Sequence, residues 1–190
     1  MNRREALSRV AVLVGGSIIG AEFFLSGCKN HGTVNTENLF EKDTIAFLNE
    51  AGETILPQTT TPGAKAADVG SFMAVMVRDC YSDKDQETFK KGLTQLNNSC
   101  KEKYKKDFMD ASKEQRLELL TQLDKEAKEY NKNKKKDEPN HYFTMIKQLT
   151  LLGFFTSEVG CKQALRYVPV PGKYDGNYPY KKGDKAWALA

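Results

Sequence analysis

The apolar residues of this chain recur every three or four positions, and this period constrains the fold more than any other feature. Phe89, Leu93, Leu96, Cys100 and Tyr104 step by four, three, four and four residues, which places them on one face of a helix. No segment shows the alternation of apolar and polar residues that indicates a strand. The sequence therefore predicts an all-α domain of about five or six helices.

Capping residues divide the helical segments from one another. The first helix is expected over residues 38–55. Asp68, Ser82 and Ser112 are candidate N-caps of the next three helices, and Ser112 forms a capping box with Gln115. Their expected core faces include Val69, Phe72, Met73, Met76, Val77 and Cys80 in the second helix, and Leu117, Leu120, Leu123, Ala127 and Tyr130 in the fourth.

The most apolar run of the mature domain lies late in the chain. Residues 131–140 are polar and contain a lysine cluster diluted by acidic residues, which favours a solvated loop over a polyanion site. Residues 141–155 carry few charges and predict a central helix buried on most of its circumference. Ser157 is expected to cap one more short helix that reaches Leu165.

The N-terminal residues form a different kind of sequence. Arg3 and Arg4 provide a basic start, residues 10–21 are apolar and rich in small side chains, and the stretch ends at Leu25-Ser26-Gly27-Cys28. This order is typical of a secretory signal, and the apolar run is shorter than the roughly 20 residues that a spanning helix needs. The paired arginines resemble a twin-arginine signal, with Sec export left open. The last four residues resemble a lipobox, which predicts a diacylglycerol on the Cys28 thiol.

Three parts of the chain follow from this interpretation. Residues 1–27 are the expected signal peptide, residues 28–37 a polar tether, and residues 38–190 the helical domain. Cleavage before Cys28 leaves 190 − 27 = 163 residues with a net charge of 26 − 23 = +3. So small a charge does not indicate nucleic-acid binding. A buried N-terminal helix of a cytosolic protein is the alternative.

The sequence offers little material for catalysis or for a cofactor. It contains no Cys-x-x-Cys pair, no haem-attachment motif and no P-loop, so we expect neither a metal nor a cofactor in this chain. His141 is expected to cap or pack at the start of its helix rather than to act as a base. Glu158 is expected to form a cap or an internal ion pair.

The remaining cysteines are expected to be free. If a turn near Ser82 joins two antiparallel helices, Cys80 lies at the turn and Cys100 about 25 Å away, which is too far for a disulfide. Buried free thiols are therefore the prediction, and the state of Cys161 is left open.

The C-terminal residues 167–190 form an extended arm rich in proline and glycine. Aromatic side chains on such an arm either pack on their own domain or anchor it in a partner's groove, and both alternatives stay open. The candidate partner-interface residues are Tyr167, Tyr174, Tyr178, Tyr180 and Trp187.

Three segments resemble motifs of one family. They are Glu53-Thr-Ile-Leu-Pro-Gln-Thr-Thr-Thr-Pro-Gly-Ala-Lys-Ala-Ala67, Leu152-Gly-Phe-Phe-Thr-Ser-Glu-Val-Gly160 and Leu165-Arg-Tyr-Val-Pro-Val-Pro-Gly-Lys-Tyr-Asp-Gly176. In this order they are similar to the gluconate 2-dehydrogenase subunit 3 family, over nearly the whole mature chain. The second segment makes Thr156, Ser157 and Glu158 candidate structural or functional residues.

The resemblance implies an accessory subunit without catalytic activity. In such complexes the large subunit carries FAD and oxidises the substrate, a cytochrome subunit often accepts the electrons, and the small subunit supports maturation and export. We therefore expect a lipid-anchored subunit on the periplasmic side of a bacterial membrane, in a complex acting on sugars, sugar acids or glycosides. The alternatives are a stand-alone ligand-binding lipoprotein, and an enzyme that uses Glu158 or His141.

Overall fold

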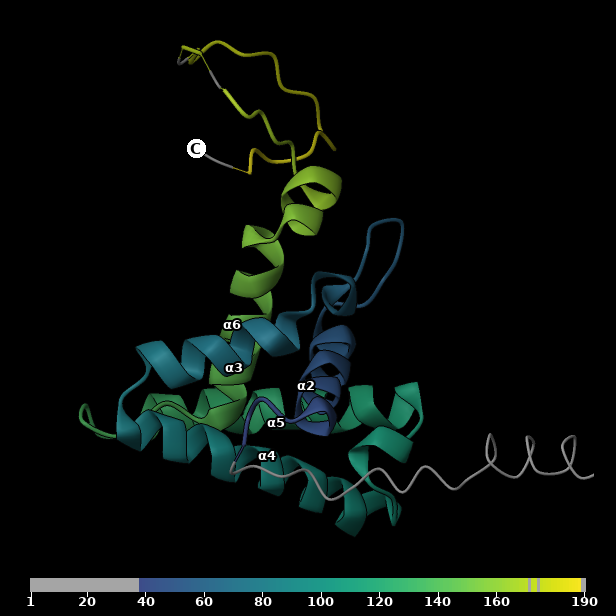
Figure 1. Ribbon diagram of the computed structural model, residues 1–190, viewed down its shortest axis with the longest axis vertical. Helices are drawn as coiled ribbons and strands as arrows, with labels where there is room; N and C mark the ends of the chain where they lie inside the picture. The colour runs from purple at the N-terminus through teal and green to yellow at the C-terminus, as the bar shows by residue number, and fades with distance from the viewer. Residues whose placement is uncertain (1–37, 171, 174, 189–190) are drawn as a thin grey trace, which may run out of the picture. The chain divides into compact units, whose positions relative to one another are not determined.

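The computed structural model describes residues 38–170, 172–173 and 175–188, all of which belong to Thr33–Ala190, one of the two units into which the chain divides. The predicted signal peptide with Arg3 and Arg4, and the tether with Cys28, lie outside the described residues. The elements of the described part are α2 (Lys42–Ile55), η1 (Ala64–Ala67), α3 (Val69–Cys80), α4 (Asp83–Tyr104), η2 (Phe108–Asp110), α5 (Lys113–Asn133), α6 (Tyr142–Thr156) and η3 (Gly160–Ala164). Figure 1 shows their arrangement.

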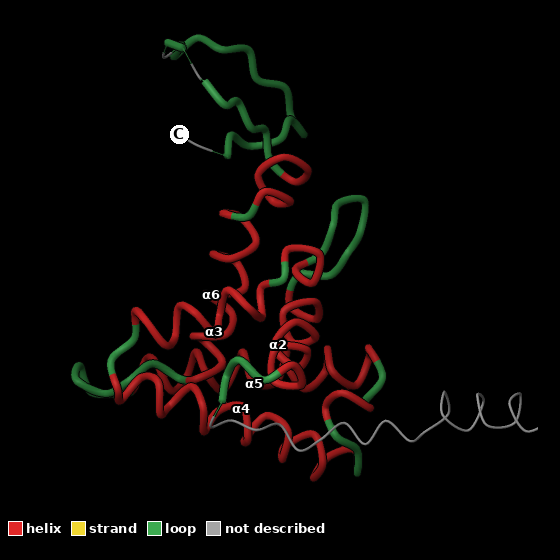
Figure 2. The backbone as a smooth tube through the Cα atoms, in the orientation of Figure 1, coloured by secondary structure: helices red, strands yellow, loops and turns green. Residues whose placement is uncertain are grey.

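The all-α prediction is confirmed. The five elements labelled α are α-helices, η1 and η2 are short 3-10 turns, and η3 is a single π-helical turn. Across the described ranges no strand forms, and the only sheet-like pairing is an isolated bridge between Arg166 and Trp187 (Figure 2). None of the helices in this part of the chain is long and apolar enough to cross a membrane.

Helix α6 lies at the centre of the packing. It contacts α2, α3, α4 and α5, and its buried side chains include Met145, Ile146, Leu149 and Phe154. Each such side chain contributes roughly 1.5–3 kcal/mol when removed from water. The helix is not buried all round, however, because Leu151, Leu152 and Phe155 on its C-terminal half are exposed. The prediction of a central helix is confirmed, but the C-terminal half of this helix is more exposed than predicted.

The first helix starts at Lys42, four residues after the predicted start at residue 38. The starts predicted after Asp68, Ser82 and Ser112 are confirmed, but the first of these three is stabilised differently. Ser82 Oγ accepts a hydrogen bond from the backbone N–H of Asp85, and Ser112 with Gln115 makes the full capping box. Asp68 precedes α3 but does not cap it, because its backbone is left-handed (φ 48°) and its carboxylate accepts from Asn49 Nδ2 at 2.7 Å. The amide oxygen of Asn49 instead accepts from the N–H of Gly70 at 2.8 Å, so a side chain of α2 satisfies the start of α3.

A buried ion pair joins α2 to α5. Arg116 Nη1 lies 2.5 Å from Glu50 Oε1, and the two side chains are only 10% and 15% exposed. Lys65 Nζ binds the other carboxylate oxygen at 2.8 Å from a more exposed position. Burial would raise the pKa of Glu50, but the hydrogen bonds and charges of Lys65 and Arg116 outweigh burial and hold this pKa below its usual value.

The sequence pattern missed this arrangement. Leu117 was expected in the core and is 56% exposed, whereas Arg116 and Leu119 are buried. Leu120, Leu123 and Ala127 are buried as predicted, whereas Tyr130 is exposed. The core face of α5 therefore differs from the prediction at its two ends, and Arg116 can be buried because Glu50 neutralises its charge. Helix α5 also extends to Asn133, three residues into the predicted loop.

The three described cysteines are free thiols. Cys100 is buried as predicted, and Cys161 is partly exposed. The prediction for Cys80 is wrong, since its side chain is exposed. The core-facing series of α3 ends at Val77, and Cys80 is the last residue of the helix, where burial is no longer imposed.

Candidate docking surface

The first motif segment forms a clamped loop after α2. The carboxylate of Glu53 accepts hydrogen bonds from the backbone N–H groups of Gln58 at 2.8 Å and Lys65 at 2.9 Å. Gly63 is required here, because a Cβ at this position would collide with the Glu53 carboxylate and with the Gln58 nitrogen. The loop from residue 57 to residue 60 is exposed. The motif thus holds a polar loop in one conformation.

The second motif segment ends α6. Ser157 Oγ donates to the carbonyl of Phe154 at 2.7 Å and accepts from the N–H of Gly160 at 3.0 Å, which confirms its role as the cap of the following turn. Thr156 Oγ1 donates to the carbonyl of Leu152 at 2.7 Å. Both hydroxyls therefore act on the backbone of the helix end.

Glu158 lies on the surface beside this helix end. It pairs with Lys162 at 2.7 Å, and the hydrogen bond from Lys162 lowers the pKa of this exposed carboxyl. The predicted ion pair is confirmed. An exposed carboxylate with a lowered pKa is a poor proton donor at neutral pH.

Gly160 sets the direction in which the chain leaves α6. It opens the π turn, in which the N–H of Leu165 donates to the Gly160 carbonyl at 2.9 Å. A Cβ on Gly160 would collide with the backbone carbonyl of Phe154, which belongs to the preceding helix and cannot move as a side chain would. The path from α6 into the C-terminal arm therefore depends on a glycine at this position.

The C-terminal arm is taken from here on as residues 165–190, because the residues just before 167 take part in its fold, and its described part closes on itself. The N–H of Arg166 donates to the carbonyl of Ala186, and the N–H of Ala188 donates to the carbonyl of Arg166, both at 2.8 Å. The Arg166 guanidinium lies 4.7 Å from the Trp187 ring centroid and 5.5 Å from that of Tyr178. The two rings meet edge to face at 5.3 Å. Arg166 thus links both ends of the arm.

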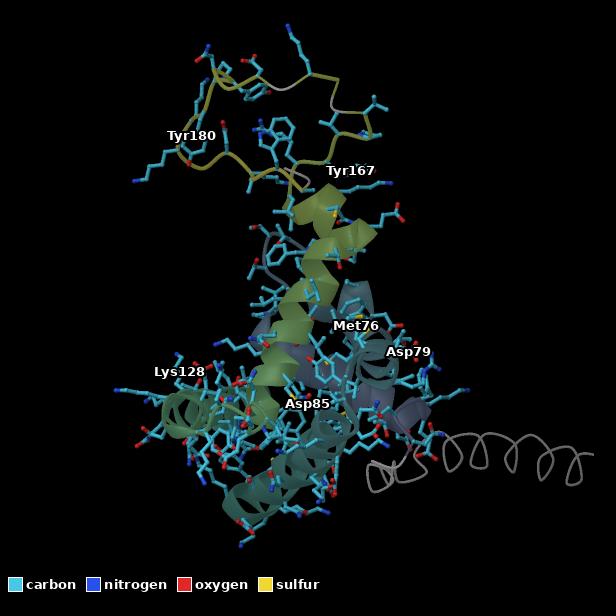
Figure 3. All side chains as sticks on the ribbon, turned by 90° about the vertical axis from the view of Figure 1, so that its left-hand side faces the viewer. Met76, Asp79, Asp85, Lys128, Tyr167 and Tyr180 are labelled. Carbon is cyan, nitrogen blue, oxygen red and sulfur yellow. The ribbon has the colours of Figure 1, made fainter. Side chains whose placement is uncertain are left out.

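The structure separates the predicted interface residues into two groups. Tyr178 and Trp187 pack against Arg166 within the arm and keep part of their rings exposed. Tyr180 is 76% exposed and makes no such stack, and Tyr167 is also exposed. Figure 3 shows both on the arm beyond the last helical turn. Tyr174 lies outside the described residues. Partner contact stays a prediction for all five residues.

Sequence reasoning missed two parts of this surface. Arg166 organises the arm, and no local signal distinguishes it from the four lysines of the same segment. The exposed apolar residues Leu151, Leu152 and Phe155 were assigned to the core, because the C-terminal half of this helix has few polar residues to show which side is covered. Exposed apolar residues that cluster on one element are typical of contact surfaces.

His141 caps α6, as expected. Its Nδ1 accepts from the N–H of Phe143 at 3.2 Å, and its ring packs on Tyr142. Burial lowers the pKa of His141, and the charge of Glu126 only partly offsets burial, so the imidazole is neutral in the folded state at neutral pH.

The neutral cap predicts a pH dependence of stability. Because the folded pKa is depressed, the contribution of His141 to the free energy of unfolding is complete above about pH 6.5 and falls as the pH drops toward the folded pKa. His141→Asn keeps a capping oxygen. Urea unfolding at a series of pH values measures the free energy of unfolding of this variant. Near neutral pH we expect this free energy to be within about 1 kcal/mol of the wild-type value, and at lower pH we expect the decline due to His141 to be absent. If the variant shows the same loss of stability at low pH as wild type, other titrating groups cause that loss.

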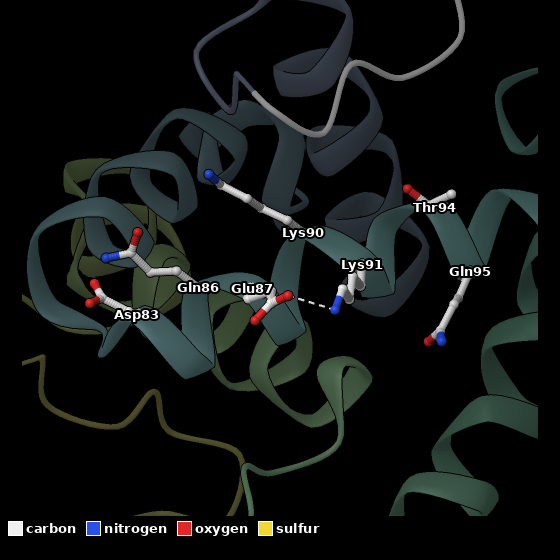
Figure 4. A pocket seen from close by; sticks show the side chains of 7 residues that line it. All are labelled: Asp83, Gln86, Glu87, Lys90, Lys91, Thr94 and Gln95. Carbon is white, nitrogen blue, oxygen red and sulfur yellow. Dashed lines mark ion pairs between the residues drawn. The ribbon is translucent and has the colours of Figure 1, made fainter.

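One hollow of the described surface is open and lined by polar and charged side chains. Figure 4 shows it on the outer face of α4, where Glu87 and Lys91 form an ion pair at 2.6 Å. Its described lining residues are Asp83, Gln86, Glu87, Lys90, Lys91, Thr94 and Gln95. A flavin ring needs an enclosed, largely apolar site. Among the described residues, no group of three or more His, Cys, Asp or Glu side chains is placed to hold a metal ion.

The fold and the arm define a small all-α protein that ends in a closed aromatic arm. The chain belongs to the gluconate 2-dehydrogenase subunit 3 family, whose profile matches residues 42–172. This match confirms the family resemblance, and it ends at residue 172, within the third motif segment. The family name makes the chain one subunit of a dehydrogenase complex, with other subunits as its partners. Neither the curated proteins nor the solved structures contain a significant match.

Proposed function

We propose that this chain is a non-catalytic accessory subunit of an exported, FAD-dependent dehydrogenase that acts on sugars, sugar acids or glycosides. Its arm docks on the large subunit, which carries the FAD, and a cytochrome subunit completes the complex. The observation that carries this proposal is the closed arm, which presents Tyr167, Tyr180 and part of Trp187 on a domain that belongs to a dehydrogenase-subunit family. Tyrosine, tryptophan and arginine are the residues most enriched at the energetic centres of interfaces.

The N-terminal residues supply the other half of the proposal. A twin-arginine signal exports folded cargo, so the large subunit with its FAD could cross the membrane on the signal of this chain. A lipid on Cys28 would then hold the complex on the periplasmic side of the membrane. Replacing Arg3 and Arg4 with lysine should leave both subunits in the cytoplasm, and continued export would favour the Sec route.

Deletion of the arm tests the docking role. The full chain is tagged, expressed in its native host and purified with its partners, and the large subunit is recognised by its flavin absorption and by mass spectrometry. Deleting residues 167–190 should remove this flavoprotein from the purified material. The deletion leaves the core intact, since the buried apolar residues of the described part lie between Leu39 and Phe154. Circular dichroism checks that the helices remain.

The outcomes separate the competing functions. Unchanged recovery of the flavoprotein would place docking elsewhere on the domain. If the full chain recovers no flavoprotein at all, the stand-alone ligand-binding lipoprotein becomes the better hypothesis. Sugar oxidation by the isolated chain with an added dye acceptor would favour an enzyme.

A further inference from the structure

The positive charge of the mature chain is concentrated in the arm. Residues 28–164 contain 21 Lys and Arg and 21 Asp and Glu, so their net charge is 21 − 21 = 0. Residues 165–190 contain five Lys and Arg and two Asp, so their net charge is 5 − 2 = +3. The whole +3 of the mature chain therefore belongs to its last 26 residues, beside a neutral helical body.

The two acidic residues of the arm are engaged within it. Asp184 pairs with Arg166 at 3.8 Å and accepts from the backbone N–H of Lys181 at 2.9 Å. Asp175 accepts from the N–H of Asn177 at 3.0 Å. These carboxylates stabilise the turns of the arm. Both carboxylates therefore bind backbone N–H groups of the arm.

The four lysines of the arm are exposed, and one of them, Lys185, donates to the carbonyl of Gln163. Lys173, Lys181 and Lys182 are exposed, and within the described residues none of the three takes part in an ion pair. Some lysines of the helical body are paired with acidic residues, and the acidic residues of the body balance its Lys and Arg in number. The paired lysines include Lys65, Lys91, Lys101, Lys103, Lys128 and Lys147.

We infer that the arm docks on an acidic face of the large subunit, with its aromatic residues as anchors and its lysines around them. The inference rests on the proposed function. Aromatic residues and arginine suit the buried centre of an interface, and charges at the rim steer association and set its salt dependence. Because the helical body has no net charge, the arm supplies the net positive charge that is available for this steering.

An anionic membrane is the other acidic surface that such an arm could meet, and the structure favours it less. Polybasic segments that bind acidic lipids gather four to eight cations in one cluster. The lysines here are spread from residue 173 to residue 185 and are interrupted by acidic residues. The Trp187 and Tyr178 rings are also turned toward Arg166, which withdraws part of their surface from a bilayer.

Charge reversal tests the inference. The arm variant carries Lys173→Glu, Lys181→Glu and Lys182→Glu. The matched control carries Lys132→Glu, Lys135→Glu and Lys136→Glu at exposed positions at the end of α5 and in the loop after it. Both variants change the net charge equally. Association of each full chain with the purified large subunit is measured at low and at high salt. At low salt we expect the arm variant to associate at least about tenfold more slowly, the control to match wild type, and high salt to slow wild type toward the arm variant.

The results distinguish this inference from the proposal on which it rests. If arm deletion abolishes association while charge reversal leaves it unchanged at every salt concentration, docking stands and the acidic face is refuted. If the arm variant and the control slow association equally, the effect comes from the net charge of the chain and not from the arm, and the inference is overturned. The chain could instead bind phosphatidylcholine vesicles only when these contain phosphatidylglycerol. If the arm variant loses this vesicle binding but still binds the large subunit normally, the lysines of the arm bind the membrane and the inference is overturned.

Discussion

Replacing Arg116 with methionine is expected to lower the free energy of unfolding by about 3–5 kcal/mol, the usual cost of removing one partner from a buried ion pair. Glu50 would keep its buried position and retain only Lys65, whose side chain is 59% exposed and therefore screened by water. Methionine fills much of the space of the arginine stem against Phe108, so the loss reports the charge rather than a cavity. Urea unfolding of the purified chain near neutral pH measures it.

The double variant Glu50→Met with Arg116→Met is the matched control. Replacing both members of a buried pair by apolar residues is often close to neutral, so the double variant should regain most of the lost stability. It also removes the Arg116 Nε, which is buried without a hydrogen-bond partner in the described part of the protein. A single variant within 1 kcal/mol of wild type would show that the pair contributes little.

The pH dependence of the same variants follows from the sign of the Glu50 shift. The pKa of Glu50 is depressed in the folded wild type, so its contribution to stability is complete above about pH 4.5 and is lost as the pH falls through the folded pKa. Without Arg116, burial favours the neutral carboxyl. The difference in stability between wild type and Arg116→Met should therefore narrow on acidification.

Replacing Gly160 with alanine is expected to uncouple the arm from α6 without unfolding the domain. The new Cβ collides with the Phe154 carbonyl, so the π turn has to rearrange and the arm leaves the helix in another direction. A misplaced anchor needs to cost only about 1.4 kcal/mol to weaken association with the large subunit tenfold, and we expect at least that loss. Hydrogen exchange should accelerate in the peptide from residue 157 to residue 166, where the Ser157 and Leu165 hydrogen bonds are broken.

One further measurement and one control variant distinguish a displaced arm from an unfolded arm. The emission of Trp187, the only tryptophan of the chain, should stay unchanged, because the contacts with Arg166 and Tyr178 lie within the arm itself. Gln163→Ala is the matched control, since the bond from Lys185 uses the Gln163 carbonyl and survives the substitution. Wild-type exchange and association in Gly160→Ala would mean that the turn tolerates the extra carbon and that Gly160 does not position the arm.

Local patterns were sufficient to predict most of the fold. The stripe from Phe89 to Cys100 is buried, and Ser82 and Ser112 cap their helices, because these features depend only on residues within one or two turns. Contacts between distant segments could not be predicted in this way. Arg116 enters the core only because Glu50 neutralises it, and Asn49 satisfies the start of α3 in place of Asp68.

The sequence predicted which residue types make up the candidate site, but it did not predict how these residues contact one another. A run of aromatic residues among prolines and glycines marked the arm correctly as non-helical, but no local signal indicates that residues 166 and 187 pair. Arg166 was overlooked for the same reason, since its importance comes from rings that lie 12 and 21 residues further along the chain, at Tyr178 and Trp187.

The closure of the arm at Arg166 makes it an exchangeable module. Both of its ends are held at one residue, so the loop between them can lengthen, shorten or change sequence while the helical body stays the same. Each doubling of such a loop costs only about 0.6 kcal/mol in closure entropy. On the proposed docking role, an arm transplanted at this junction should transfer the choice of partner with it.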